Sequence, residues 1–282
     1  MYKRVLATVN EHLNSEITAR YALHFAKRAN AKIWFCSIAE NGIGEKDFQI
    51  AQDAVRRLAA HAEAMGFKAE CILKTGKPLE QVSRIVLDEK IDLVFTATRH
   101  EDVEKRFYAR TTARRLSLRL PCSVALVRVV NLGRVQPRNI LVPLKARIDH
   151  VDERAAFTAI MAGAFESRIH ILHTGKPVVR LFLEETLVTP LEWEEAGLPA
   201  DIVRFTKQLK RYDISLDKKF VPGATPGRSI TVEAAAKRHD MIIMGASERS
   251  LLNSFLKGNP VERVLREATC DLIILKPRME RR

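Results

Sequence analysis

Two glycines in the last part of the chain stand where a phosphate group could approach the backbone. Gly245 ends an apolar run that we expect to be a strand, and Gly258 precedes an expected helix. Asn259 is a favourable N-cap residue, and Pro260 suits a first helical turn because its missing N–H costs nothing there. Glycine lets a ligand come close to the backbone, and the free N–H groups of a helix start favour an anion. The pattern therefore predicts a phosphate-binding site in this region.

The elements that must position these residues alternate along the chain. Nearly continuous apolar runs are followed by segments with apolar residues at helical spacing, which is typical of a parallel sheet covered on both faces. Expected strands are 3–10, 32–39, 69–73, 93–98 and 123–129, then 139–144, 169–174, 214–222, 241–246 and 271–275. Expected helices are 15–29, 47–65, 79–87 and 103–119, then 151–165, 200–212, 229–238 and 252–267.

These elements divide into two domains. Residues 131–137 carry one Gly and one Pro and show no periodicity, so we expect a linker at 131–138 between domains at 1–130 and 139–282. The predicted fold class is α/β, with two tandem five-stranded parallel-sheet domains and helices on both faces. The second half also repeats letters of the first in the same order: Asp92 aligns with Asp240, and Cys122 with Cys270. This agreement of letters and elements indicates a duplication.

The residues from Met244 to Ser250, with Lys257 to Leu265 and the last strand, resemble the C-terminal half of a universal stress protein domain. That family has Gly-x2-Gly-x9-Gly followed by Ser or Thr, then a helix and a final strand. The whole chain resembles two such domains in tandem. The resemblance implies a stress-response regulatory or binding protein, not an enzyme, that binds ATP, with magnesium, in its C-terminal domain only.

The resemblance also implies which residues hold the nucleotide. They are Lys145, Gly245, Ser247, Arg249, Gly258 and Asn259. Two positions depart from the family pattern, because Glu248 stands where the second glycine belongs and Lys145 where the family usually has Asp. A carboxylate near phosphates repels them, and Lys145 or Arg249 could compensate.

The N-terminal copy has lost the motif. Ala97 aligns with Gly245, Arg110 with Gly258, and Thr111 with Asn259. A side chain as large as arginine blocks the approach of a phosphate to the backbone. We therefore expect a role in structure or recognition for this copy.

The last strand of each copy would be exposed if it stayed unpaired. The family's domains commonly dimerise through this strand, which here lies at 123–129 and 271–275. Both are short and apolar, and an unpaired edge of this kind invites aggregation. We expect the two strands to pair within one chain as an intramolecular pseudo-dimer, and a homodimer of the whole chain stays open.

A second function hypothesis uses the basic character of the chain, whose formal net charge is +13. Arg106, Arg110 and Arg114 are spaced four apart and could form one helical stripe for an anionic partner such as RNA or a ribosomal surface. A solvated face beside nearby acidic residues is the interpretation we favour. If the basic surface does bind an acidic partner, the protein would be a nucleotide-free interaction or scaffold protein whose partner, a transporter, ribosome or enzyme, is not identified by the sequence. An adenylating ligase is a third hypothesis, but its signature loops are missing.

Several other features of the sequence bear on location, metal binding and partner binding. No apolar run is long enough to span a membrane, so we expect a cytoplasmic protein without membrane insertion. Cys36, Cys71, Cys122 and Cys270 are expected to be buried and reduced, and no His, Cys or carboxylate cluster has metal-ligand spacing. Residues 178–195 are unusually apolar, and we expect a helix that packs on its own sheet, with partner binding as the alternative.

Overall fold

The computed structural model describes residues 1–40, 42, 44–98, 111–133, 135–175, 180–182, 185–187, 197–222, 225–246 and 259–278. The first half contains β1 (Arg4–Val9), α1 (Leu13–Ala29), β2 (Lys32–Ala39), α2 (Glu45–Ala64), β3 (Ala69–Thr75), α3 (Pro78–Asp88), β4 (Leu93–Thr98), α5 (Thr112–Arg119) and β5 (Ser123–Arg128). The second contains β6 (Asn139–Leu144), α6 (Val151–Phe165), β7 (Arg168–Gly175), β8 (Arg180–Phe182), β9 (Glu185–Leu187), α7 (Ala200–Lys210), β10 (Leu216–Pro222), α8 (Pro226–Ala236), β11 (Met241–Gly245), α10 (Pro260–Glu267) and β12 (Asp271–Lys276). The α/β class predicted from the sequence is confirmed.

One continuous sheet of ten strands runs through both halves, in the order β10-β7-β6-β11-β12-β5-β4-β1-β2-β3. Neighbouring strands within each half are parallel, whereas β5 and β12 are antiparallel, with Leu126 opposite Ile274. The two copies therefore join through their last strands within one chain, as the apolar edges predicted. Each copy keeps its own five strands, but they share one sheet.

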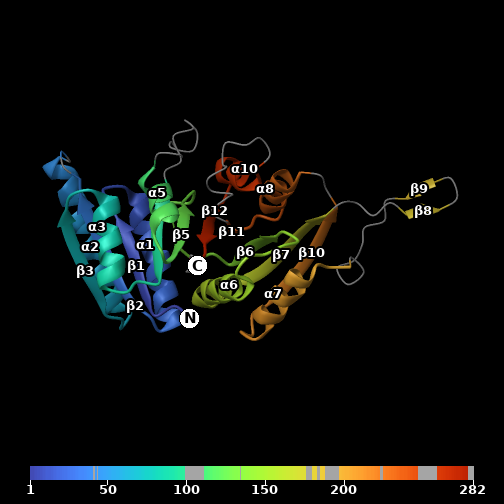
Figure 1. Cartoon of the computed structure of the whole chain (residues 1–282), viewed down its shortest axis with the longest axis horizontal. Coiled ribbons are helices and arrows are strands. Elements are labelled where there is room, and N and C mark those ends of the chain that lie inside the picture. Colours follow the sequence, from blue (N-terminus) through green and yellow to red (C-terminus); the bar gives the residue numbers. More distant parts are fainter. Residues whose placement is uncertain are drawn as a thin grey trace.

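Helices cover both faces of this sheet. In the second half α6 and α7 lie on one side of the strands, with α8 and α10 on the other (Figure 1). On the α1 and α6 side the core crosses the boundary between the copies, because the rings of Phe25 and Phe157 lie 5.1 Å apart and those of Phe95 and Phe157 6.0 Å apart. The two copies thus stabilise each other through a common core.

Buried polar groups also tie the copies together. The Tyr21 hydroxyl donates to Asp271 Oδ2 over 2.6 Å, and Asp271 Oδ1 accepts from the backbone N–H groups of Val130 and Asn131. Burial, reinforced by the Asp271 carboxylate, raises the pKa of Tyr21. This carboxylate joins α1, the connection after β5 and the start of β12.

One pair of residues that the sequence repeat aligns, Asp92 and Asp240, has the same structural role in both copies. Asp92 Oδ2 accepts from the backbone N–H groups of Lys3 and Arg4, at 2.7 and 3.2 Å. Asp240 Oδ2 accepts from the backbone N–H groups of Arg138 and Asn139, both at 2.8 Å. Each aspartate thus anchors the start of the first strand of its own copy.

Of the expected helix at 178–195, the structure describes residues 180–182 and 185–187, and these are not helical. They form β8 and β9, which pair antiparallel and lie apart from the ten-stranded sheet (Figure 1). An apolar run alone does not distinguish helix from strand, and for this reason the predicted helix was wrong at these residues.

Two helix starts are fixed by side-chain caps. The Thr111 hydroxyl accepts from the Arg114 backbone N–H at 3.3 Å, and α5 begins at Thr112. Asn259 Oδ1 accepts from the Val261 N–H at 3.0 Å, with Pro260 in the first turn of α10, which confirms the predicted cap. The remainder of the helices expected at 103–119 and 252–267 lies outside the described residues.

Two expectations about exposure need correction. Cys71 is exposed, because it lies on the edge strand β3, whereas Cys36, Cys122 and Cys270 are buried. Arg114 is only 5% exposed, so it does not continue an open stripe with Arg106 and Arg110, which lie outside the described residues. In the part of the chain that the structure describes, no helix is both long and apolar enough to cross a membrane.

Candidate functional site

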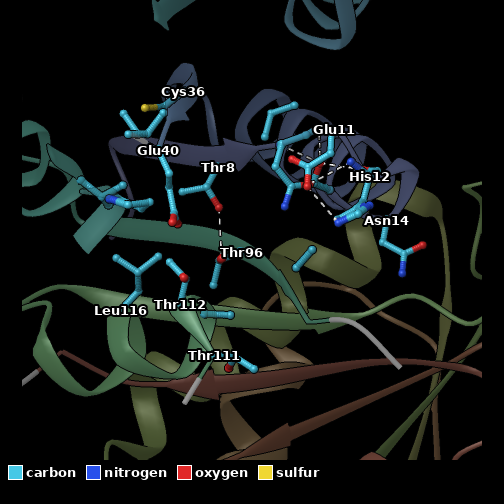
Figure 2. A pocket seen from close by; sticks show the side chains of 18 of the residues that line it. Thr8, Glu11, His12, Asn14, Cys36, Glu40, Thr96, Thr111, Thr112 and Leu116 are labelled. Carbon is cyan, nitrogen blue, oxygen red and sulfur yellow. Dashed lines mark hydrogen bonds and ion pairs between the residues drawn. The ribbon is translucent and has the colours of Figure 1, made fainter. Parts of the chain in front are cut away.

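A cavity of about 650 Å³ opens at the carboxyl ends of β1 and β4, in the N-terminal copy (Figure 2). Ligands of open parallel α/β sheets bind outside the carboxyl ends of the strands, and this volume suits a small molecule. Its polar lining comprises Thr8, Asn10, Glu11, His12, Asn14, Ser15, Glu40, Thr96, Thr98, Thr111 and Thr112. This is therefore the candidate ligand site.

Threonine hydroxyls line the strand side of the cavity. Thr8 Oγ1 donates to Thr96 Oγ1 across β1 and β4 at 3.0 Å, the contact drawn in Figure 2. Thr98, two residues further along β4, is 2% exposed, and its buried Oγ1 has no hydrogen-bond partner among the residues that the structure describes. Buried polar atoms are nearly always paired, so this hydroxyl is suited to bind a polar group of a ligand.

The start of α5 faces the same cavity. Thr111, Thr112 and Ala113 all belong to the lining, and Thr111 is the N-cap. The first N–H groups of a helix and the positive end of its dipole favour an anion. The cavity thus places an anion-favouring helix start close to an unpaired hydroxyl.

Acidic groups form another part of the wall. Glu11 and Glu40 line the cavity, and Glu11 Oε1 lies 3.0 Å from His12 Nε2. Figure 2 shows Glu11 and His12 grouped at one end, together with Asn14. Carboxylates repel a bare polyphosphate, whereas a magnesium ion is usually held by one or two carboxylates together with the phosphates. The lining fits a nucleotide better when a cation accompanies the phosphates.

The connection after β1 is fixed by local bonds. Ser15 Oγ accepts from the Asn10 N–H at 2.9 Å and lies 2.8 Å from the His12 carbonyl oxygen, to which it donates. The Ser15 hydroxyl is thereby occupied with holding the loop. Its role here is structural support of the wall.

The strand positions of the C-terminal copy that correspond to the threonines on β1 and β4 are apolar. Strand registers align the copies, since Leu6 pairs with Val94 in the first and Leu141 with Ile242 in the second. Thr8, Thr96 and Thr98 then correspond to Pro143, Met244 and Ala246. Met244 and Ala246 are 7% and 2% exposed and pack in a core with α8 and α10. Side chains that give the first copy a polar wall are thus replaced by core residues in the second.

Gly245 leaves room for a protein side chain. A Cβ built on it would lie 1.0 Å from Nη1 of Arg154, whose guanidinium lies directly over the glycine. Arg154 comes from the first turn of α6, is 7% exposed and donates from Nη2 to the Ala246 carbonyl at 3.2 Å. The space that a side chain at position 245 would need is taken by this arginine.

The six residues that the sequence predicted for ATP fall into three groups. Lys145 and Gly245 line a small pocket of about 40 Å³, where Lys145 Nζ also lies 3.6 Å from Asp149. Asn259 caps α10, which packs on the other face of the sheet. The other three, Ser247, Arg249 and Gly258, lie outside the described residues.

The threonines of the large cavity were missed by sequence reasoning. Thr96 and Thr98 alternate in a strand that is otherwise apolar, and this was the available signal. We nevertheless expected no ligand here, because Ala97 and Arg110 replace the glycines of the family motif. Arg110 lies outside the described residues. Among those residues there is also no group of three or more His, Cys, Asp or Glu side chains that could hold a metal ion.

The fold and the cavity together define a duplicated α/β protein with a polar cavity in its first copy. The chain belongs to the universal stress protein family, whose sequence profile matches residues 1–128 and 137–276. No curated protein matches the sequence.

Solved structures share the fold over nearly the whole chain. A universal stress protein from Archaeoglobus fulgidus is 16% identical with a TM-score of 0.68, covering 98% of this chain and 97% of that one. The cytoplasmic domain of a prokaryotic cation chloride cotransporter is 10% identical with a TM-score of 0.66, covering 100% and 98%. A universal stress protein from Pseudomonas aeruginosa UCBPP-PA14, described as putative, is 16% identical with a TM-score of 0.57, covering 98% and 94%. These likenesses show the fold.

Proposed function

We propose that the protein is a cytoplasmic stress-response regulator that binds an adenine nucleotide in its N-terminal copy, while the C-terminal copy supports it. The polar 650 Å³ cavity carries this proposal, because it places an unpaired buried hydroxyl, Thr98 Oγ1, near the start of α5. In the C-terminal copy, Arg154 lies over Gly245 of the family motif, and the pocket that Lys145 and Gly245 line within the described residues measures about 40 Å³. The nucleotide thus has room in the copy that lacks the motif.

The proposed role is binding and signalling, not catalysis. The Ser15 hydroxyl is bonded to its own loop, and the Thr8 hydroxyl is bonded to Thr96. The Ser15 hydroxyl thus supports the wall of the cavity, and the Thr8–Thr96 pair forms part of its polar lining. Magnesium would accompany ATP here, because Glu11 and Glu40 would otherwise repel the phosphates.

The test is a direct search for bound nucleotide followed by titration. The purified chain is denatured and its supernatant chromatographed; ATP, AMP and adenosine are then titrated by calorimetry, with and without magnesium. Thr98→Val removes the unpaired hydroxyl at nearly constant shape, and we expect binding about tenfold weaker. Thr112→Trp fills the exposed mouth of the cavity from α5 and should abolish binding.

Gly258→Arg is the matched variant in the C-terminal copy. Binding that survives Gly258→Arg and is lost in Thr112→Trp supports the N-terminal site. The opposite pattern would return the nucleotide to Lys145, Gly245, Ser247, Arg249, Gly258 and Asn259. Absence of binding to either copy at millimolar ATP would reject nucleotide sensing.

Recognition of an acidic protein partner is the second candidate. The specific observation is that α7 exposes Lys207 and Lys210 to solvent, and Arg211 follows them at its end. A cytoplasmic domain of a cotransporter has the same fold, which makes a transporter one reasonable class of partner, beside a ribosome or an enzyme. Reversing these three charges to Glu should abolish a salt-sensitive pull-down, and a partner retained by the reversed variant would count against this candidate.

A further inference from the structure

A buried positive charge lies in the C-terminal copy, away from the proposed nucleotide cavity. Arg154 is 7% exposed, and its Nη2 donates to the Ala246 carbonyl at 3.2 Å. Its buried Nε has no hydrogen-bond partner in the described part of the chain. Burial lowers the pKa of this guanidinium, and the charges of Asp149 and Glu153 offset that effect only in part.

The neighbouring carboxylates are engaged elsewhere. Within the described ranges, no carboxylate oxygen lies within 4.0 Å of the Arg154 nitrogens. Asp149 lies 3.6 Å from Lys145 Nζ, and Glu153 accepts hydrogen bonds from the hydroxyls of Tyr2 and Ser123. Arg154 therefore has no close counter-charge, although buried charges in proteins are ordinarily paired.

A small pocket lies beside this guanidinium. Its volume is about 40 Å³, and its lining combines Arg154, Lys145 and Thr158 with Gly245 and apolar side chains such as Phe205. A cavity needs about 10–15 Å³ of such volume to hold one water molecule, so this pocket has room for a small ion or a few water molecules. Water molecules would fill the space but leave the charge uncompensated.

We propose that this pocket binds one small inorganic anion of the size of chloride, held by Arg154 from α6, with Lys145 at the mouth. The anion neutralises the buried guanidinium and supplies an acceptor for its unpaired Nε–H. A nucleotide is too large for this volume, so the site is separate from the proposed nucleotide site and does not depend on it. The anion would act as a structural part of the C-terminal copy.

Thermal unfolding at constant ionic strength tests the proposal. Sodium gluconate is replaced stepwise by sodium chloride, and the melting temperature should rise with the logarithm of the chloride concentration above the dissociation constant, by about 3–5 °C at about ten times that constant. The rise should disappear in Arg154→Met. Arg204→Met is the matched control, because it removes an exposed arginine of α7 that pairs with Asp152 of α6, the helix that carries Arg154. This variant should keep the chloride effect. An equal response of the wild type and Arg154→Met would overturn the proposal.

A second measurement works even when Arg154→Met does not fold. Wild-type crystals are grown in sodium bromide, and anomalous scattering locates the bromide ions. A peak in hydrogen-bond contact with the Arg154 guanidinium is the expected result. Bromide bound only at other surface positions, with water in this pocket, would refute the site.

Discussion

The guanidinium of Arg154 occupies the space that a side chain at position 245 would need. A Cβ on Gly245 would lie 1.0 Å from Nη1 and 2.2 Å from Cζ of Arg154. Position 245 therefore requires glycine because an arginine from α6 is buried against it. A glycine in a motif and a glycine under an arginine look the same in the sequence.

The first prediction concerns this contact. Gly245→Ala should lower the free energy of unfolding by about 1–3 kcal/mol, because the buried guanidinium must move to make room. Urea unfolding measures the change. Gly133→Ala is the control, since a Cβ there meets nothing within 4 Å, and it should be close to neutral.

The double variant separates this contact from other effects of alanine. In an Arg154→Ala background, Gly245→Ala should cost clearly less than in the wild type, giving a favourable coupling energy in a double-mutant cycle. Additive effects would show that Arg154 is not the reason for the glycine.

The second prediction concerns the joint between the copies. Tyr21→Phe removes the 2.6 Å hydrogen bond to Asp271 and should lower the free energy of unfolding by about 1.5–3 kcal/mol, the usual range for a bond to a charged group. Tyr212→Phe, at an exposed tyrosine, should change it by less than about 0.5 kcal/mol. Equal effects of the two variants in urea unfolding would contradict the role given to Tyr21.

Much of the fold could be predicted because its signals are local. The strands at 32–39 and 93–98 are apolar runs bounded by polar residues, and the structure places them at the same residues. The pairing of β5 with β12 followed from a physical need, since two short apolar edges cannot stay exposed. The helix predicted at 178–195 was wrong at residues 180–182 and 185–187, because an apolar run without a clear period fits a strand as well as a helix.

The candidate site could not be predicted in the same way. A cavity depends on which volumes are missing where distant segments meet, and Thr8, Thr98 and Thr111 come from three such segments. The motif around Gly245 was visible in the sequence, but the arginine over it comes from a helix far earlier in the chain. Local sequence patterns thus predict helices and strands, but the size of a cavity depends on how side chains from distant segments pack.

The third prediction concerns thiol reactivity. The sequence has four cysteines, of which Cys71 is exposed and Cys36, Cys122 and Cys270 are buried. A thiol reagent such as Ellman's reagent should therefore modify one thiol in the native protein and all four after unfolding in guanidinium. Cys71→Ala should abolish the native reaction, and fast labelling of two or more native thiols would show that a buried cysteine is accessible.

The fourth prediction concerns alkaline pH. Burial raises the pKa of Cys36 and of Cys122 to about 12, above an ordinary value of about 8.5. As pH rises above about 8.5, the unfolded chain loses these protons while the native protein keeps them, so the free energy of unfolding falls. It should decline between about pH 8 and pH 10, measured by urea unfolding in reducing buffer. Cys36→Ala should make this decline shallower, and a free energy that stays level up to pH 10 would refute the argument.

The fifth prediction uses the aligned aspartates. Asp92→Ala and Asp240→Ala each remove the acceptor of two backbone N–H groups at the start of a first strand, and each should lower the free energy of unfolding by about 1–3 kcal/mol. Because the copies share one sheet and one core around Phe157, both variants should shift a single unfolding transition, detected alike by fluorescence and circular dichroism. Asp53→Ala, which removes an exposed i,i+3 pair, is the control and should have little effect. Unfolding in two separate steps, one moved only by Asp92→Ala and the other only by Asp240→Ala, would show that the copies fold independently despite the β5–β12 pairing.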